Sequence, residues 1–286
     1  MIGRGKAEGG KRKGEGGRRK SGVAAHGDDR LKILMIHDLR RDYFDLPLEN
    51  YRLTFDDGLY SQYYYQPLLR SHPETLTYFI TTSLIDEGPA RPQFSGRFLD
   101  PMETGVYSFR AFIEGDREGF MTLEEVRFLA EQPNVRLGAH SHFHDLILTD
   151  VHPRHPRPVS PWKLARFHRI PEALRRGLSI RSRLAFQGFE FRAGRLVGRS
   201  KSDWLDYIRR DTEHCLEWFA RHLDHHPTAY CFPFNEYSPP LMKVLRSFGF
   251  REFYGGRSPR NTRIIGRTDI DSLPNPSTDR RAGAHP

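Results

Sequence analysis

Residues 51–58 of this 286-residue chain read YRLTFDDG, an apolar stretch that ends in two adjacent carboxylates and a glycine. Apolar side chains alternate with Arg52 and Thr54, which predicts a β-strand that delivers Asp56 and Asp57 to its carboxyl end. Ligands bind at that edge of the sheet in open α/β folds. Neighbouring residues at a strand end diverge, so one carboxylate could hold a metal while the other handles a proton. Because Asp-Gly is also ordinary turn chemistry, the stretch needs partners elsewhere in the chain.

Strand and helix patterns alternate on both sides of this stretch. Strands are predicted at 31–36, 76–81 and 135–139, with helices at 61–71 and, from the capping box Thr122-Leu-Glu-Glu125, at 122–131. Further on, the pattern predicts helices at 203–225 and 238–247 and strands at 228–234, 251–254 and 263–265. Repeated strand, helix and strand units favour a parallel sheet. Residues 86–120 are expected to cross the mouth of the fold as a binding or lid segment.

Composition predicts a single folded domain, placed at residues 30–272, with one substantial core from 37% apolar residues. Residues 146–201, rich in Pro and Arg, are expected to be an insertion with only weak helical periodicity. Residues 1–29 are predicted to be a disordered basic tail, and residues 273–286 a frayed one. The start of the chain lacks the apolar region of a secretory signal, and no apolar run has the length of a membrane span. Two cysteines form no disulfide framework, which favours a cytoplasmic setting.

The formal charge of +9 is concentrated in two segments. Residues 1–20 and 154–201 carry the excess of Lys and Arg, and the remainder of the chain is mildly acidic. The basic segment 154–201 could be a solvated face, or it could receive a sugar on an anionic nucleotide or lipid carrier, since Arg binds phosphate in a bidentate way. Peripheral contact with anionic membrane lipids is a further alternative. A nucleic-acid partner is not expected.

A second motif, GAHSHFH at 138–144, also follows a predicted strand. If a helix begins after His140, the imidazoles of His140 and His144 lie on one face and can share a cation. With Asp57 they offer two nitrogens and one oxygen, which is the open ligand set of a catalytic zinc rather than a closed structural site. His142 would point elsewhere, and Asp145 could accept a hydrogen bond from a ligating imidazole or serve in a turn.

Three stretches together resemble the leading motifs of the polysaccharide deacetylase family, the NodB-homology group of carbohydrate esterase family four. They are TFDDG at 54–58, HSHFH at 140–144 and CFPFNEY at 231–237. The resemblance implies a deformed (β/α)7-type barrel and a hydrolase that removes an acetyl group, most readily an N-acetyl group, from a sugar or glycan. It assigns a divalent metal, Zn²⁺ first and Ni²⁺, Co²⁺ or Mn²⁺ as alternatives, to Asp57, His140 and His144. Asp56 would be the general base, and the backbone N–H of Phe234, after the motif's Pro233, would stabilise the oxyanion.

Two positions depart from the family's pattern. Cys231 stands where some members have an arginine that orients the base, and Ile265-Gly-Arg267 stands where the usual Leu-x-His supplies the general acid. Some members with a permuted motif order carry the acid histidine at the end of the first strand. His37 occupies that place here and is the predicted acid, with a purely structural role as the alternative. The competing functions are a hydrolase of small non-sugar amides on the same scaffold and a catalytically inactive binding protein.

Overall fold

The computed structural model describes residues 31–156, 158–256 and 263–274. Leu31–Pro286 form one compact unit, and the predicted basic tail lies outside the described residues, as does most of the predicted C-terminal tail. No described helix combines the length and the apolar character needed to cross a bilayer.

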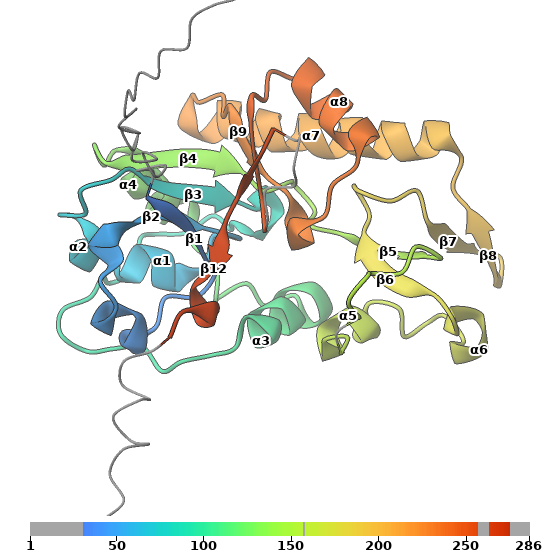
Figure 1. Ribbon diagram of the computed structural model, residues 1–286, viewed down its shortest axis with the longest axis horizontal. Helices are drawn as coiled ribbons and strands as arrows, with labels where there is room; N and C mark the ends of the chain where they lie inside the picture. Colours follow the sequence, from blue (N-terminus) through green and yellow to red (C-terminus); the bar gives the residue numbers. More distant parts are fainter. Residues whose placement is uncertain (1–30, 157, 257–262, 275–286) are drawn as a thin grey trace, which may run out of the picture. The chain divides into compact units, whose positions relative to one another are not determined.

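An eight-stranded parallel sheet forms the centre of the unit (Figure 1). Its strands are β1 Lys32–Ile36, β2 Tyr51–Phe55, β3 Leu76–Ile80, β4 Val135–Ala139, β9 Ala229–Cys231, β10 Glu252–Gly255, β11 Ile264–Gly266 and β12 Thr268–Asp269. They follow the order β11-β10-β9-β4-β3-β2-β1-β12, and every neighbouring pair is parallel. The strands β11 and β12 lie at opposite edges, yet only Arg267 separates them in the chain.

This single segment therefore joins the two edges into a nearly closed barrel, which confirms the predicted α/β barrel. The count of about seven strands differs because one continuous stretch, residues 264–269, contributes a strand to each edge. Its two halves pair with different neighbours: Tyr254 faces Ile265, and Leu34 faces Thr268.

Helices cover the barrel at the places that the apolar periodicity predicts. They are α1 Tyr60–Tyr64, α2 Gln66–Leu69, α4 Leu123–Ala130, α7 Lys201–Leu223 and α8 Pro239–Ser247. The capping box of α4 is formed, with Thr122 and Glu125 satisfying each other's backbone N–H groups. The helix expected at 61–71 is divided at Tyr65, because Pro67 has no N–H to donate and its ring opposes the carbonyl four residues earlier.

The segment at 86–120 contributes one short helix, α3 Thr104–Phe109, followed by a turn of π-helix at Arg110–Glu114. Short 3-10 turns occur at Arg41–Asp45, Leu48–Asn50, Thr82–Leu84, Pro233–Asn235 and Ile270–Ser272. The helix α3 contacts the insertion's first helix, so the two excursions from the barrel meet.

The insertion is more ordered than its sequence indicates. It holds an antiparallel sheet, β5 Leu146–Thr149, β6 Ser179–Ser182, β7 Phe189–Arg192 and β8 Arg195–Gly198, with the short helices α5 Pro161–Ala165 and α6 Glu172–Arg175. The sequence pattern did not indicate these strands, because each is only four residues long and three of them, β6, β7 and β8, contain arginine. A two-residue turn at Ala193-Gly194, both with positive φ, closes the β7–β8 hairpin. Buried Arg199 donates to the carbonyls of Arg183 and Phe186 and so ties the sheet together.

Candidate active site

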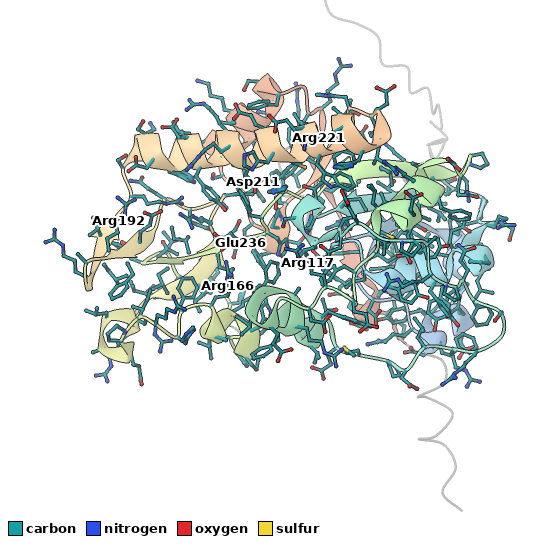
Figure 2. The ribbon with its side chains drawn as sticks, turned by 180° about the vertical axis from the view of Figure 1, so that it is seen from behind. Arg117, Arg166, Arg192, Asp211, Arg221 and Glu236 are labelled. Atoms are coloured by element: carbon teal, nitrogen blue, oxygen red, sulfur yellow. The ribbon has the colours of Figure 1, made fainter. Side chains whose placement is uncertain are left out.

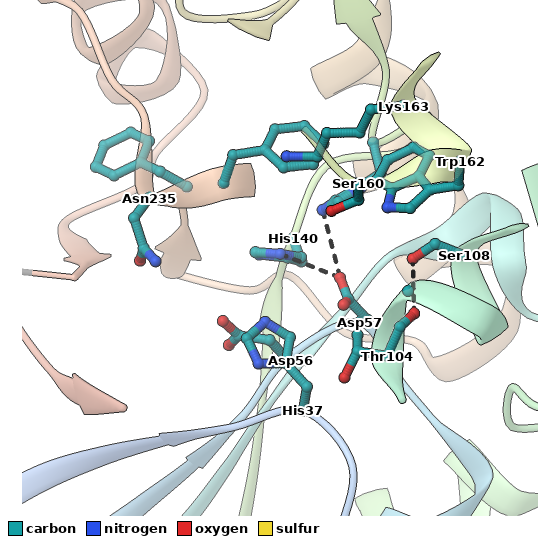
Figure 3. Close-up of a pocket in the computed structure, with 14 residues that line it drawn as sticks. His37, Asp56, Asp57, Thr104, Ser108, His140, Ser160, Trp162, Lys163 and Asn235 are labelled. Carbon is teal, nitrogen blue, oxygen red and sulfur yellow. Dashed lines mark hydrogen bonds and ion pairs between the residues drawn. The ribbon is translucent and has the colours of Figure 1, made fainter. Parts of the chain in front are cut away.

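A pocket of about 210 Å³ opens at the carboxyl ends of the barrel strands. Its lining includes five of the residues singled out by the motifs, His37 after β1, Asp56 and Asp57 after β2, and His140 and His144 after β4. Figure 3 shows Asp56, Asp57, His37 and His140 turned toward the same space. The parallel register brings them together because the ends of neighbouring parallel strands meet at one edge.

Asp57, His140 and His144 form a compact set of three buried side chains. Oδ1 of Asp57 lies 3.3 Å from Nε2 of His140 and 3.4 Å from Nε2 of His144. Beyond these two contacts, this buried oxygen has no hydrogen-bond partner among the described residues. One ligand atom from each residue can therefore reach a common ion.

The two imidazoles are held in fixed orientations. His140 Nδ1 lies 3.0 Å from the Cys231 carbonyl oxygen and can donate to it as Nδ1–H, which leaves Nε2 on the side of Asp57. The ring of His144 lies between Phe112 and Phe234, at centroid distances of 6.1 and 4.4 Å. Burial is the main cause that lowers the pKa of His144 to about 4, which keeps this imidazole neutral at pH 7. Two imidazole nitrogens and a carboxylate oxygen are the donor set of a catalytic zinc site, so these residues fit the predicted metal.

The segment from His140 to His144 is a loop, so the helix expected after His140 is wrong. Ser141 and His144 have φ of 70° and 49°, which no α-helix accommodates. Asp211 on α7 shapes this loop by accepting hydrogen bonds from the backbone N–H groups of His142 and Phe143. The side chain of His142 bonds Thr82 and stays outside the metal set, in line with its exclusion.

Asp56 is held by an arginine that the motif comparison assigned to no role. Arg267 donates from Nη1 to Oδ1 at 2.6 Å and from Nη2 to Oδ2 at 2.8 Å, and both side chains are buried. The same Nη2 lies 2.9 Å from the sulfur of Cys231. Burial raises the pKa of Asp56, but the charge of Arg267, together with His140, the hydrogen bonds of Arg267 and His37, outweighs it, and the net pKa is below the ordinary value.

An arginine thus contacts Asp56 although Cys231, and not an arginine, stands at the motif position. The guanidinium enters from the barrel-closing segment between β11 and β12 and reaches the sulfur of Cys231, the residue that occupies the motif position. The available signal was an arginine two residues after a strand candidate.

Gln62 on α1 is a second residue that the sequence reasoning missed. Its fully buried Nε2 donates to the carbonyl oxygens of His37 at 2.7 Å and of Asp56 at 2.6 Å. One side chain thus fixes the ends of β1 and β2 relative to each other, and with them the predicted acid and the predicted base. An amide on the inward face of the helix that follows TFDDG was the signal for it.

The outer wall of the pocket comes from the two excursions and the proline loop. Thr104 and Ser108 of α3 lie on one side, and Trp162 and Lys163 of α5 on another (Figure 3). The predicted Pro233 is buried at the start of its 3-10 turn, and the backbone of Phe234 is left-handed at φ 60°. Strained backbone of this kind concentrates at functional sites.

Asp145 does not contact an imidazole, so the hydrogen bond considered for it is absent. Its carboxylate instead accepts from Arg166 at 2.8 Å and from Arg183 at 3.0 Å, within the insertion.

The sequence matches no family model and no curated protein. Solved structures do resemble the fold. A de-N-acetylase from Aggregatibacter actinomycetemcomitans is 14% identical with a TM-score of 0.53, over 87% of this chain and 98% of that one. The BpsB deacetylase domain from Bordetella bronchiseptica is 16% identical with a TM-score of 0.54, over 83% and 94%. IcaB from Ammonifex degensii is 13% identical with a TM-score of 0.50, over 90% and 96%. At these identities the likeness concerns the fold, and the chain has the NodB-like barrel fold of the polysaccharide deacetylases.

Proposed function

We propose that this protein is a metal-dependent hydrolase that removes an acetyl group, most readily an N-acetyl group, from a sugar in a polysaccharide or glycan. The observation that carries the proposal is the arrangement of two carboxylates at the end of β2. Asp57 lies within reach of two buried imidazoles, while Asp56 is outside that set and is kept ionised by Arg267. The names of two structural neighbours, a de-N-acetylase and a deacetylase domain, support the same reaction class.

Asp57 Oδ1 and the Nε2 atoms of His140 and His144 would hold the metal. Zn²⁺ suits these donors best, and Ni²⁺, Co²⁺ and Mn²⁺ are alternatives. When bound, the ion would supply an activated water and polarise the acyl oxygen.

The remaining steps fall to the chain's own side chains. Asp56 would take the proton of the attacking water, since Arg267 orients its carboxylate and lowers its pKa. The N–H of Phe234 would donate to the oxyanion as negative charge develops. His37, which lines the same pocket, would give a proton to the leaving nitrogen as the C–N bond breaks. The products are acetate and a free amine.

The pocket's size and walls suit an acetylated sugar. Its volume of about 210 Å³ accepts an acetamido group and part of one ring, and Trp162 and Phe234 offer aromatic surfaces beside it. The cytoplasmic setting remains a prediction, in keeping with Cys215 and Cys231 being free thiols.

The proposal is tested by measuring metal content and acetate release from an N-acetylglucosamine hexasaccharide. We expect one tightly bound divalent ion per chain and acetate release that a chelator abolishes. Asp56→Asn should keep the metal and lower kcat by about 10²- to 10⁴-fold, because the general base is lost. Asp57→Asn should lose the metal.

Asp100→Asn, at an exposed carboxylate outside the pocket, is the matched control and should change neither quantity. Full metal occupancy without acetate release from any acetylated saccharide would contradict the proposed reaction. Normal turnover by the Asp56→Asn variant would contradict the assigned base.

A further inference from the structure

A second and larger cleft adjoins the catalytic pocket. Its volume is about 1350 Å³, and it shares Ser160, Lys163, Phe234 and Asn235 with the pocket that holds the two carboxylates. Small-molecule sites usually occupy about 300–1,000 Å³, so this cleft has room for more than the single sugar at the reaction centre. A ligand that fills both spaces must be extended.

Cationic side chains from three elements of the insertion line this cleft. Lys163 comes from α5, Arg175 and Arg176 come from α6 and the residue after it, and Arg181 comes from β6. Glu172 and Glu236 are the carboxylates in the lining. Convergence of separate elements on one cavity distinguishes these cations from the scattered charges of a solvated face.

Most of this positive charge is not neutralised within the protein. Glu236 accepts hydrogen bonds from Arg181 Nε at 2.5 Å and from the backbone N–H of Ser182 at 2.7 Å. Arg175 donates from Nε to the carbonyl of Ile170, and its outer guanidinium nitrogens bond no carboxylate among the described residues. The structure shows no side-chain partner for Arg176 within the part of the chain it describes.

Other arginines of the insertion behave differently. Arg166 and Arg183 pair with Asp145, and Arg192 pairs with Glu190, so their charges are satisfied locally. By contrast, no ion pair among the described residues neutralises Lys163, Arg175 or Arg176 in the cleft. Lys163 stands at its inner end, with Nζ 4.4 Å from the ring centroid of Phe234, and connects the cleft with the catalytic pocket.

We propose that this cleft binds an anionic group, a carboxylate or a phosphate, carried by the saccharide substrate beyond the acetylated sugar. This inference rests on the proposed deacetylase function and specifies its substrate class. Guanidinium groups recognise both anions through paired N–H donors. Aliphatic and proline side chains such as Pro158, Val159 and Leu164 complete the walls and offer surface for the apolar faces of sugar rings.

The test measures binding without turnover. The native chain is stripped of metal with a chelator, dialysed, and titrated calorimetrically with three probes at about 0.15 M salt. The probes are a neutral chitin hexasaccharide, a hyaluronan hexasaccharide with a uronate in every second unit, and a chitin pentasaccharide 1-phosphate. We expect at least one anionic probe to bind tenfold or more tightly than the neutral probe. Preference for the uronate or for the phosphate probe identifies the source of the anion.

The double variant Arg175→Gln/Arg176→Gln should lose this preference and keep the affinity for the neutral probe. Its matched control is Arg195→Gln/Arg221→Gln, which removes two exposed arginines outside the cleft, Arg221 on α7 (Figure 2). Thermal unfolding of both variants checks that they fold. The control should retain the native preference for anionic probes.

Equal affinity for neutral and anionic probes, or an unchanged preference in the cleft variant, would overturn the proposal. The proposal would also be overturned if a polygalacturonate hexasaccharide bound as tightly as the anionic acetylated probes, because it carries no acetylated sugar. If the cleft variant instead lost binding only to anionic lipid vesicles, the arginines would belong to a membrane surface. Because no readout depends on catalysis, absence of acetate release would refute the proposed function and leave this test intact.

Discussion

At the scale of single residues, the contact between Asp56 and Arg267 leads to a testable prediction about the pKa of Asp56. Arg267→Met removes the strongest of the interactions that oppose the burial of Asp56, so the carboxyl pKa should rise. A base must be ionised to act, so the acidic limb of the rate profile should move to higher pH. Loss of the buried partner should also cost about 3–5 kcal/mol of stability. The pH dependence of kcat/KM and urea unfolding measure the two effects.

Arg267→Lys serves as the control that separates charge from geometry. It keeps the positive charge but cannot form the bidentate contact, so the acidic limb should stay low while kcat falls by about 10²-fold through misplacement of the base. An acidic limb that is the same in the Met variant and in the native protein would show that Arg267 does not set the pKa of the base.

The sequence indicated which motif residues lie together at the strand ends, but not the residues that hold them in place. Local sequence patterns indicate Asp56, Asp57, His140 and His144, because strand-end carboxylates and paired imidazoles have a recognisable spacing. Arg267 lies 211 positions from Asp56, and Gln62 acts by contacting two carbonyl oxygens rather than a catalytic side chain. Such contacts depend on how the barrel closes, which no local pattern encodes.

At the scale of elements, α7 supports the metal-binding loop through Asp211. Burial, opposed by the N–H groups of Phe143 and His142, raises the pKa of Asp211 to about 7. Between about pH 4 and pH 7 the folded protein therefore keeps a proton that the unfolded chain releases, so this group's contribution to stability falls as pH rises through that window. Asp211→Asn retains Oδ1 as an acceptor and removes the titration.

We expect the Asn variant to gain stability relative to the native protein as pH rises, by at most about 1.4 kcal/mol per pH unit in that window. Urea unfolding at pH 5 and pH 7 measures it. Asp206→Asn, an exposed carboxylate on the same helix, is the control and should shift stability by less than about 0.5 kcal/mol. Parallel pH profiles for the native protein and the Asp211 variant would contradict the prediction.

Element prediction succeeded where the pattern was long and apolar. The helix α7 and the strands β1 to β4 were predicted because their buried faces repeat regularly. The insertion's sheet was missed, since four-residue strands with exposed arginines resemble loop sequence. The helix considered after His140 is absent, because a four-residue histidine spacing suits both a helix and a strained turn.

At the scale of the whole barrel, closure depends on the contacts of one short segment. Asp271, just after β12, accepts hydrogen bonds from Tyr43 and from Arg40, each at 2.6 Å. Asp271→Ala should remove both hydrogen bonds. Because the carboxylate is partly exposed, we expect the free energy of unfolding to fall by about 1 kcal/mol, which lowers Tm by about 2–4 °C. Hydrogen exchange of residues 263–274 should accelerate more than that of β3.

Asp42→Asn is the matched control, since Asp42 contacts the same Arg40 but not the closing segment. It should leave the exchange of residues 263–274 unchanged. Unaltered exchange in the Asp271 variant would show that closure is held by strand pairing alone.

The position of Arg267 in the closing segment has a consequence for the order of events during biosynthesis. Every other residue assigned to the reaction precedes it in the chain, so a ribosome exposes the three metal ligands, the acid and the base before the arginine. A nascent or proteolysed chain without residues 264–269 would contain the three proposed metal ligands, but Asp56 would have no arginine partner. If the proposed reaction is correct, acetate release requires residues 264–269, and their loss by proteolysis would abolish it while leaving the three proposed metal ligands in place.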